Sequence, residues 1–432
     1  MIETADPERL RRHQLDALRR LVDTLVESNP FYGPKLRDAG LADGIDSLDH
    51  FTGALPITSK DELVADQRAH PPYGTNQTFP LDRYVRFHQT SGTTGRPMRW
   101  LDTTEDWQWM VGHWRKVFEA CGVDADDRIL FPFSFGPFLG FWTAFDAAAS
   151  LGALALPGGG LPSSARLRLL IDNQATAVCC TPTYAIRLGE VARQERFDLI
   201  TAPIAKVIVA GEPGGGVEAV RRRIAELWGA EVFDHHGMTE VGPVSYPSRQ
   251  VPGVLHVIGS SYLAEILDLD TGRPVQPGAT GELILTTLGR VGMPLLRYRT
   301  GDLVRVSEHS PETLGTADPA LDGGILARAD DMVVVRGVNL YPAAIDRVVR
   351  GFSEVAEYRV ELRTARSMVE MRIEIEPRAE VDPDGLCRRI ADALRNAFSL
   401  RLPVAAAEPG SLPRFELKAK RWHRIEEPAA SP

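Results

Sequence analysis

The chain has 432 residues, 44% of them hydrophobic and 25% charged, a composition typical of a globular protein with two or three domains. A net charge of −9 without a long basic run argues against a general nucleic-acid binder. The N-terminus is acidic and polar, and no apolar window is long enough to span a bilayer, so we expect neither a signal peptide nor a membrane span. The four cysteines are Cys121, Cys179, Cys180 and Cys387. They lack CxxC spacing and nearby histidine pairs, which disfavours disulfides and a structural zinc site and favours a reducing cytoplasm.

The first half of the chain predicts helices followed by an α/β layer. Leucines at helical spacing predict helices over residues 7–40, with breaks at Asn29-Pro30 and Gly33-Pro34, and Tyr84–Phe87 reads as a strand. Short apolar runs then alternate with amphipathic segments, which predicts strands and helices in layers. The expected strands are Arg128–Pro132, Ala177–Thr181 and Lys206–Ala210, and the expected helices are Ser163–Asn173, Tyr184–Gln194 and Gly216–Trp228.

Two further regions follow. Shorter β segments separated by turns fill Val254–Val306. A small α+β unit begins near Met332, with expected strands at Val333–Arg336 and Glu370–Glu376 and helices at Pro342–Arg350 and Pro383–Ala397. We therefore expect an α/β fold with two domains, a large one of layered sheets and helices over residues 1–329 and a small one over 330–432.

The segment His88–Arg96 combines glycines, hydroxyl groups and one cation. Glycines allow close backbone approach, hydroxyls donate hydrogen bonds to oxygens, and an arginine adds charge, so the segment suits a polyphosphate. It is not a Walker A sequence, because no Gly-Lys-Ser/Thr ends it. Taken alone it fits a polar turn equally well.

Other polar groups stand where strands are expected to end. Gly211-Glu212-Pro213 follows Lys206–Ala210, and ligands gather at the carboxyl ends of strands in α/β sheets. Phe233–Glu240 holds two adjacent histidines, which point to opposite sides of an extended chain and do not readily chelate one ion. A lone glutamate such as Glu240 suits Mg²⁺ bound to phosphate. Asp302 can accept two ribose hydroxyls or occupy a turn.

An aromatic segment, Phe131–Trp142, contains five phenylalanines. Such rings pack in a protein core or line a pocket for a flat aromatic ligand, and the residues alone leave both interpretations open.

Taken in order from Thr90 to Lys418, these segments resemble the adenylate-forming enzymes, which include acyl-CoA synthetases, adenylation domains and luciferases. The phenylacetate-CoA ligase branch is the most similar. Its characteristic segments are Leu55–Leu63, Thr181–Ala185, Met293–Asp302 and Arg336–Pro342. These segments and the polar segments described above follow the family's order, with six motifs from Thr90 to Lys418, and this makes the resemblance specific.

The resemblance assigns the nucleotide site. Thr239 would contact the α-phosphate, Glu240 would bind Mg²⁺, Asp302 would bind the ribose, and Lys418 would be the catalytic lysine of a mobile C-terminal lid. The remaining nucleotide-binding residues implied by the resemblance are Thr90, Ser91, Gly92, Thr93, Thr94, Gly95, Arg96, Gly211, Glu212, Pro213, His235, His236, Gly237, Met238 and Arg328. Three residues depart from the family pattern: Arg96 replaces a lysine, His236 a tyrosine that stacks on adenine, and Ala327 a glycine.

The resemblance also implies a lid hinge, a thiol tunnel and an acyl pocket. The hinge is Asp330, and the tunnel residues are Arg336, Gly337, Val338 and Asn339. The acyl pocket is assigned to Phe135, Gly136, Phe138, Gly140, Phe141 and Ala210. We expect the two glycines, Gly136 and Gly140, to leave room for a substrate ring, which favours an aryl acid.

The implied reaction joins a carboxylic acid to a thiol with ATP, Mg²⁺ and coenzyme A. The acid forms an acyl-AMP with release of pyrophosphate, and a CoA thiol then displaces AMP. A carrier-protein phosphopantetheine is an alternative acceptor, because it delivers the same thiol arm. Relatives in this branch are often dimers, so a homodimer is a further expectation by analogy. An inactive sensor or scaffold that binds acyl-adenylate is a third reading, which the joint presence of Thr239, Glu240, Asp302 and Lys418 disfavours.

Overall fold

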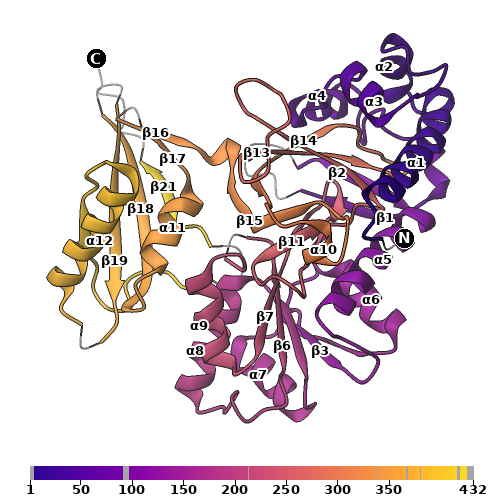
Figure 1. Ribbon diagram of the computed structural model, residues 1–432. Helices are drawn as coiled ribbons and strands as arrows, with labels where there is room; N and C mark the ends of the chain where they lie inside the picture. The colour runs from indigo at the N-terminus through magenta and orange to yellow at the C-terminus, as the bar shows by residue number, and fades with distance from the viewer. Residues whose placement is uncertain are drawn as a thin grey trace.

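The computed structural model describes residues 4–90, 97–212, 214–336, 338–365, 368–379, 381–415 and 419–425. The elements form a large body (residues 4–328) and a small lid (residues 332–425) that lies against one side of it (Figure 1). The mixed α/β architecture confirms the predicted fold class. Among the described residues, no helix is both long and apolar enough to cross a membrane.

The N-terminal helices lie within the predicted region, but the break predicted at Gly33-Pro34 is wrong. Both residues lie in the first turn of a helix, where a proline is tolerated because its missing N–H would have no partner there. Helix α1 (Pro7–Ser28) starts at Asp6, whose carboxylate accepts hydrogen bonds from the N–H groups of Glu8 and Arg9. It ends at Asn29, as the break at Asn29-Pro30 predicts. The helices that follow are α2 (Tyr32–Asp38), α3 (Leu48–Ala54) and α4 (Lys60–Ala69).

A five-stranded parallel sheet forms the lower part of the body in Figure 1. Its three central strands are short apolar runs, which suit burial on both faces. In sheet order they are β4 (Leu154–Pro157), β3 (Arg128–Phe131), β5 (Ala177–Cys180), β6 (Lys206–Ala210) and β7 (Glu231–His235). The connecting helices are α6 (Trp142–Leu151), α7 (Ser163–Asp172), α8 (Pro182–Glu195) and α9 (Glu218–Trp228). The carboxyl ends of β6 and β7 therefore lie side by side.

A six-stranded antiparallel sheet forms the upper part of the body. Its order is β10 (Ser245–Pro247), β11 (Val254–Val257), β15 (Ala320–Arg328), β14 (Tyr298–Val306), β13 (Thr280–Thr287) and β12 (Tyr262–Leu267), with α10 (Pro311–Leu314) between β14 and β15 in the chain. The register of β14 and β15 pairs Asp302 with Arg328.

The remaining body elements connect the two sheets. The short helix η1 (Leu81–Arg83) leads into a hairpin of β1 (Tyr84–Gln89) and β2 (Arg99–Thr103). Helix α5 (Thr104–Ala120) follows, and a capping box of Thr103 and Asp106 fixes its start. A small pair, β8 (Gly237–Met238) and β9 (Gly242–Pro243), carries the turn after β7.

The lid has its own core of buried aliphatic side chains, such as Ile345, Val360, Ile373 and Ile390. A connecting turn, η2 (Ala329–Asp331), leads into it. Its elements are β16 (Val333–Val335), β17 (Val338–Leu340), α11 (Pro342–Arg350), β18 (Val355–Ala365), β19 (Met368–Pro377), α12 (Pro383–Phe398), β20 (Val404–Ala406) and β21 (Trp422–Ile425).

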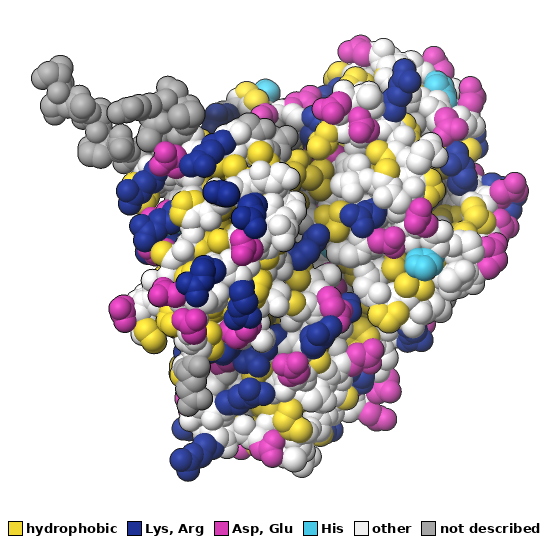
Figure 2. Space-filling model, turned by 60° about the vertical axis from the view of Figure 1, so that its left-hand side comes forward, with side chains coloured by type: hydrophobic (Ala, Val, Ile, Leu, Met, Phe, Trp, Pro, Cys, Tyr) yellow, Lys and Arg dark blue, Asp and Glu magenta, His cyan; other side chains and the backbone are white. Residues whose placement is uncertain are grey.

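Strands β20, β19, β18 and β21 form one sheet against which α11 and α12 pack. Lysine and arginine side chains are frequent on the outer face of the lid, as Figure 2 shows. Arg363 and Arg372, on β18 and β19, are examples that are more than half exposed. The polar outer face and the aliphatic core together explain why this short segment packs as a unit of its own.

Candidate functional site

The candidate site lies where the carboxyl ends of β6 and β7 meet β14 and β15. His236, directly after β7, lies with Nε2 2.9 Å from Oδ2 of Asp302 on β14. Arg328 on β15 donates from Nη1 to Oδ1 of Asp302 at 2.9 Å and to the carbonyl oxygen of Thr300 at 2.8 Å. Arg328 also donates to both carboxylate oxygens of Asp330, at 3.0 and 2.9 Å. We call His236, Asp302, Arg328 and Asp330 the nucleotide-side network.

Two members of the nucleotide-side network, Asp302 and Arg328, keep their charges despite burial. Burial opposes ionisation of Asp302, but His236 and Arg328 outweigh it and hold the pKa of this carboxyl below its usual range. Burial likewise opposes the charge of Arg328, but Asp302 and Asp330 outweigh it and raise the pKa of the guanidinium. His236 Nδ1 is buried and has no hydrogen-bond partner among the described residues. The network thus joins the predicted ribose-binding and hinge residues.

A buried arginine that the sequence analysis did not select holds the Thr239–Glu240 turn. Arg290 is completely buried, and its Nη1 donates to the carbonyl oxygens of Thr239 at 3.1 Å and Glu240 at 2.7 Å. Its Nε donates to Oδ1 of Asp102 at 2.6 Å, and Asp102 is also completely buried. The sequence offers little signal for this role, because Arg290 lies in the glycine-flanked segment Gly289–Gly292, where an exposed turn is the ordinary interpretation.

Thr239 and Glu240 present their side chains near the aromatic segment and the N-terminal helices. The Thr239 hydroxyl accepts a hydrogen bond from the N–H of Leu139 at 3.4 Å. Glu240 is almost fully buried, and Lys60 Nζ lies 3.8 Å from its Oε1. Among the described residues, no group of three or more His, Cys, Asp or Glu could hold a metal. A single carboxylate fits Mg²⁺, which binds few protein carboxylates beside phosphate and water.

Thr90 closes the β1–β2 hairpin. Its N–H donates to the carbonyl oxygen of Met98 at 2.9 Å, and its Oγ1 accepts from the N–H of Met98 at 3.0 Å. The two strands therefore meet at the base of the predicted phosphate loop. The other predicted loop residues lie outside the described part of the chain, as do three more predicted site residues: Ser91, Gly92, Thr93, Thr94, Gly95, Arg96, Pro213, Gly337 and Lys418.

The side chain of His235, a predicted nucleotide-binding residue, points into the core. The ring is buried in the core 4.4 Å from Trp114, and Nδ1 lies 2.6 Å from the carbonyl oxygen of Ser245. Burial lowers its pKa to about 3, so the ring is neutral. Successive residues of a strand point to opposite sides, so the same geometry that turns His235 inward directs His236 to Asp302.

The turn after His236 is confined by close backbone contacts. Gly237 and Met238 form β8, where a Cβ at Gly237 would lie 2.9 Å from the carbonyl oxygen of Gly242. Only glycine allows this approach. The β8–β9 pair thus determines the path of the chain into Thr239.

The loop after β6 carries Glu212 toward α8 and the lid. Gly211 has φ of 93°, in the left-handed region that favours glycine. Oε1 of Glu212 accepts from the N–H of Thr183 at 2.8 Å, and Oε2 accepts from the N–H of Ala419 at 3.1 Å. In this arrangement both carboxylate oxygens of Glu212 bind backbone N–H groups of the protein, and the nucleotide contact of Glu212 stays a prediction.

Asp234 is a further carboxylate that the sequence analysis did not single out. It is surrounded by glycines: a Cβ at Gly215 would lie 2.1 Å from its Oδ1, and one at Gly324 would lie 3.1 Å from its Oδ2. Burial, only partly offset by His236, raises its pKa to about 7. Its position in the short loop Phe233–Glu240 was the available signal.

The predicted acyl segment forms an aromatic cluster of Phe133, Phe135, Phe138 and Phe141. Phe133 contacts the other three rings edge to face at 5.3–5.4 Å. Phe141 is buried against Trp114, and Ala210 at the end of β6 is also buried.

The expectation that Gly136 and Gly140 leave room for a substrate ring is wrong in this arrangement. A Cβ at Gly136 would lie 2.6 Å from the ring of Phe138, and one at Gly140 would lie 2.0 Å from the ring of Phe133. The protein's own rings already occupy the space beside both glycines. The sequence could not predict which rings lie beside these glycines, because the contacts depend on how the segment folds.

The lid residues of the predicted site are placed as follows. Asp330 lies in η2 and is 60% exposed apart from its bonds to Arg328. Arg336 is exposed at the turn between β16 and β17, with φ of 51°. Val338 packs against the lid core, and the position of the Asn339 side chain lies outside the description.

With this geometry established, comparison with known proteins gives the family. The sequence profile of the AMP-binding enzymes matches residues 48–289, more than half of the chain. The profile of the AMP-binding enzyme C-terminal domain matches residues 337–423. The chain belongs to the AMP-binding enzymes.

Curated relatives match along almost the whole chain. The phenylacetate-coenzyme A ligase of Thermus thermophilus is 30% identical, with 96% of each chain covered. The phenylacetate-coenzyme A ligase of Escherichia coli is 27% identical, with 97% of this chain and 96% of the relative covered.

Solved structures of a CoA ligase also match this chain over most of its length. A 2-hydroxyisobutyryl-CoA ligase in the postadenylation state with 2-HIB-AMP superposes with a TM-score of 0.91 at 28% identity, covering 98% of this chain and 91% of that one. The same ligase with 2-HIB-AMP and CoA in the thioesterification state gives a TM-score of 0.73. The predicted enzyme class, an AMP-forming acyl-CoA ligase that uses ATP, Mg²⁺ and CoA, is confirmed.

Proposed function

We propose that this ligase activates an aryl carboxylic acid of the phenylacetate or benzoate type and transfers it to CoA. The observation that carries the proposal is the hydrogen bond from Leu139 to the Thr239 hydroxyl, because Leu139 lies between Phe138 and Phe141. It places the aromatic cluster beside the residue proposed to contact the α-phosphate. The near full-length similarity to phenylacetate-coenzyme A ligases supports the same substrate class.

The first half-reaction brings two anions together, so charge neutralisation and alignment supply most of the catalysis. A carboxylate oxygen of the acid attacks the α-phosphorus of ATP, the bond to the β-phosphate oxygen breaks, and pyrophosphate leaves. In our proposal the loop Thr90–Arg96 and Lys418 bind phosphate oxygens, Thr239 orients the α-phosphate, and Asp302 with Arg328 holds the ribose. Mg²⁺, when bound at Glu240, neutralises phosphate charge.

The second half-reaction needs a different arrangement of the lid. The CoA sulfur attacks the acyl carbonyl carbon, the bond to the AMP phosphate oxygen breaks, and the thiol proton passes to solvent. We propose that the chain divides into domains at residues 1–329 and 330–432 and that the lid swings about Asp330. Arg336–Asn339 would then line the thiol tunnel. The separate lid core and the position of η2 support this division.

A small branched hydroxy acid is a second candidate substrate. The rings of Phe133 and Phe138 fill the space beside Gly140 and Gly136, which favours a smaller acyl group than an aryl ring. The overlap with a 2-hydroxyisobutyryl-CoA ligase supports the same reading.

The test is acid-dependent formation of AMP, measured with and without CoA. The panel holds benzoate, phenylacetate, their hydroxy and amino derivatives, 2-hydroxyisobutyrate and long aliphatic acids. We expect the highest kcat/KM with an aryl acid and thioester formation with CoA alone. Preference for 2-hydroxyisobutyrate selects the second candidate, and preference for long aliphatic acids contradicts both. If a thioester forms only with a carrier protein, the acceptor is the carrier protein and not CoA. If no acid leads to formation of AMP, the protein is a binding protein and not a ligase.

A further inference from the structure

Glu212 connects the body and the lid through two backbone N–H groups. One carboxylate oxygen accepts from Thr183 of α8, and the other accepts from Ala419 of the lid, 207 residues away in the chain. Both donors are backbone groups, so the contacts depend on where the chain runs and not on the side chains of Thr183 and Ala419.

The body side of this connection is fixed. Glu212 directly follows Gly211, whose left-handed φ turns the chain at the end of β6 toward α8. The first N–H groups of a helix have no partner inside the helix and carry partial positive charge, so a carboxylate is stabilised there. Thr181 caps the same helix end by accepting from the N–H of Tyr184 at 3.2 Å. One oxygen of Glu212 thus binds α8, and the other faces the lid.

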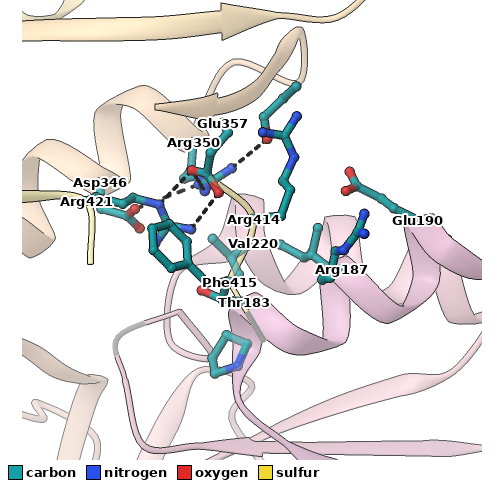
Figure 3. A pocket seen from close by; sticks show the side chains of 13 residues that line it. Thr183, Arg187, Glu190, Val220, Asp346, Arg350, Glu357, Arg414, Phe415 and Arg421 are labelled. Carbon is teal, nitrogen blue, oxygen red and sulfur yellow. Dashed lines mark hydrogen bonds and ion pairs between the residues drawn. The ribbon is translucent and has the colours of Figure 1, made fainter. Parts of the chain in front are cut away.

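The lid side is also anchored around Ala419. Before it, Arg414 pairs with Glu376, and after it, Arg421 donates from Nε to Glu357 at 2.7 Å. Phe415 faces Thr183 across the cavity between α8 and the lid (Figure 3). The chain through Ala419 is therefore held to the lid on both flanks, and Glu212 binds it to the body between them.

We propose that Glu212 is a positioning residue for the first half-reaction. Ala419 directly follows Lys418 in the sequence, so a carboxylate that holds the N–H of Ala419 near α8 restrains the chain next to the proposed catalytic lysine. The inference rests on the proposed function of Lys418 and of the moving lid. It is supported by the overall match to the postadenylation state of the related ligase, which is closer than the match to its thioesterification state. Glu212 acts through Lys418 and releases Ala419 when the lid swings.

The chain offers two matched controls. Arg378 of the lid donates to Glu190 of α8 at 3.1 Å, a second body–lid contact that does not involve Ala419. Glu190→Gln therefore weakens the general attraction between body and lid. Thr181→Ala removes the other cap of α8 without a change at the lid.

The experiment compares half-reactions in Glu212→Gln and in the controls. Glutamine has one acceptor oxygen and an NH₂ group that cannot accept from an N–H, so one of the two contacts is lost. We expect the kcat of acid-dependent ATP–pyrophosphate exchange to fall about 10- to 100-fold, the range for one lost charge-assisted hydrogen bond. The KM for ATP and thioester formation from supplied acyl-AMP and CoA should stay unchanged. Glu190→Gln and Thr181→Ala should retain exchange within about twofold.

A second variant tests the lid side. Ala419→Pro removes the N–H and leaves the cap of α8 intact, so it should also lose exchange and keep thioester formation. Unchanged exchange in either variant overturns the inference. So does an equal loss of both half-reactions or a raised KM for ATP, because either would indicate direct contact of Glu212 with the nucleotide. Absence of exchange in the wild-type protein with every acid contradicts the proposed function itself.

Discussion

The two sides of the candidate site are built in different ways. The nucleotide-side network consists of ionisable side chains joined by hydrogen bonds of 2.9–3.0 Å. The aromatic cluster consists of rings that touch edge to face and share no hydrogen bond with each other. A buried charge needs a particular partner, whereas a ring needs only the right volume.

This difference has consequences for function. The charged side connects to the lid, since Arg328 binds both Asp302 and Asp330. The ring side meets the proposed phosphate-binding residues through backbone groups, because the N–H of Leu139 donates to the Thr239 hydroxyl and the N–H of Gln89 donates to the carbonyl oxygen of Pro137. We therefore expect substitutions on the charged side to change stability and nucleotide use, and substitutions on the ring side to change which acid is accepted.

The largest expected effect is on stability at the buried Arg290. Arg290→Met removes the guanidinium partner of the completely buried Asp102 and leaves His88 Nδ1, 3.3 Å from its Oδ2, so the free energy of unfolding should fall by about 3–5 kcal/mol. Denaturant titration measures it. The control is Arg222→Ala, which removes an exposed pair with Glu218 and should cost less than about 0.5 kcal/mol. A loss below about 1 kcal/mol for Arg290→Met would show that this charge is not held as the structure indicates.

The next effect concerns nucleotide use. Asp302→Asn removes the charged acceptor shared by His236 and Arg328, a loss of about 1.5–3 kcal/mol, so kcat/KM for ATP should fall about 10- to 100-fold. The KM for the acid should change little, because the ring side is not altered. Steady-state kinetics with each substrate varied in turn would separate the two. A comparable rise in the KM for the acid would mean that the two sides are not independent.

A smaller effect is expected on the ring side. Gly140→Ala places a Cβ 2.0 Å from the ring of Phe133 at a φ of 44°, so the free energy of unfolding should fall by about 1–3 kcal/mol. Gly160→Ala is the matched control, since Gly160 has φ of 72° but no atom within 4 Å of the added Cβ. Thermal unfolding of both variants isolates the ring contact from the backbone strain. Equal losses would show that Phe133 does not fill the space beside Gly140.

The smallest effect is a shift in substrate preference. Phe138→Ala opens the space beside Gly136, so the ratio of kcat/KM for phenylacetate to that for 2-hydroxyisobutyrate should rise about 10-fold. The acid panel measures the ratio, and the KM for ATP serves as the internal control. An unchanged ratio would place the acyl group elsewhere than beside Phe138.

Much of the fold could be predicted because it depends on local pattern. The strand predicted at Lys206–Ala210 and the helix predicted at Pro342–Arg350 have the observed bounds. Strand alternation also explains why His235 and His236 diverge, a point that the sequence analysis used against a metal site. The same alternation was not applied to the nucleotide contact of His235, which lies in the core.

The sequence by itself determined the order of elements, the α/β class and the family, because periodicity and motifs are read along the chain. It also selected Asp302, an isolated carboxylate at the end of a strand, and the resemblance to adenylate-forming enzymes added His236 and Arg328. Only the tertiary structure decided that Arg290 meets Asp102 across 188 residues, that Glu212 meets Ala419, and that two phenylalanine rings fill the space beside two glycines. The reason is physical: a buried charge and a packed ring are defined by neighbours in space, and those neighbours leave no periodic signal in the chain.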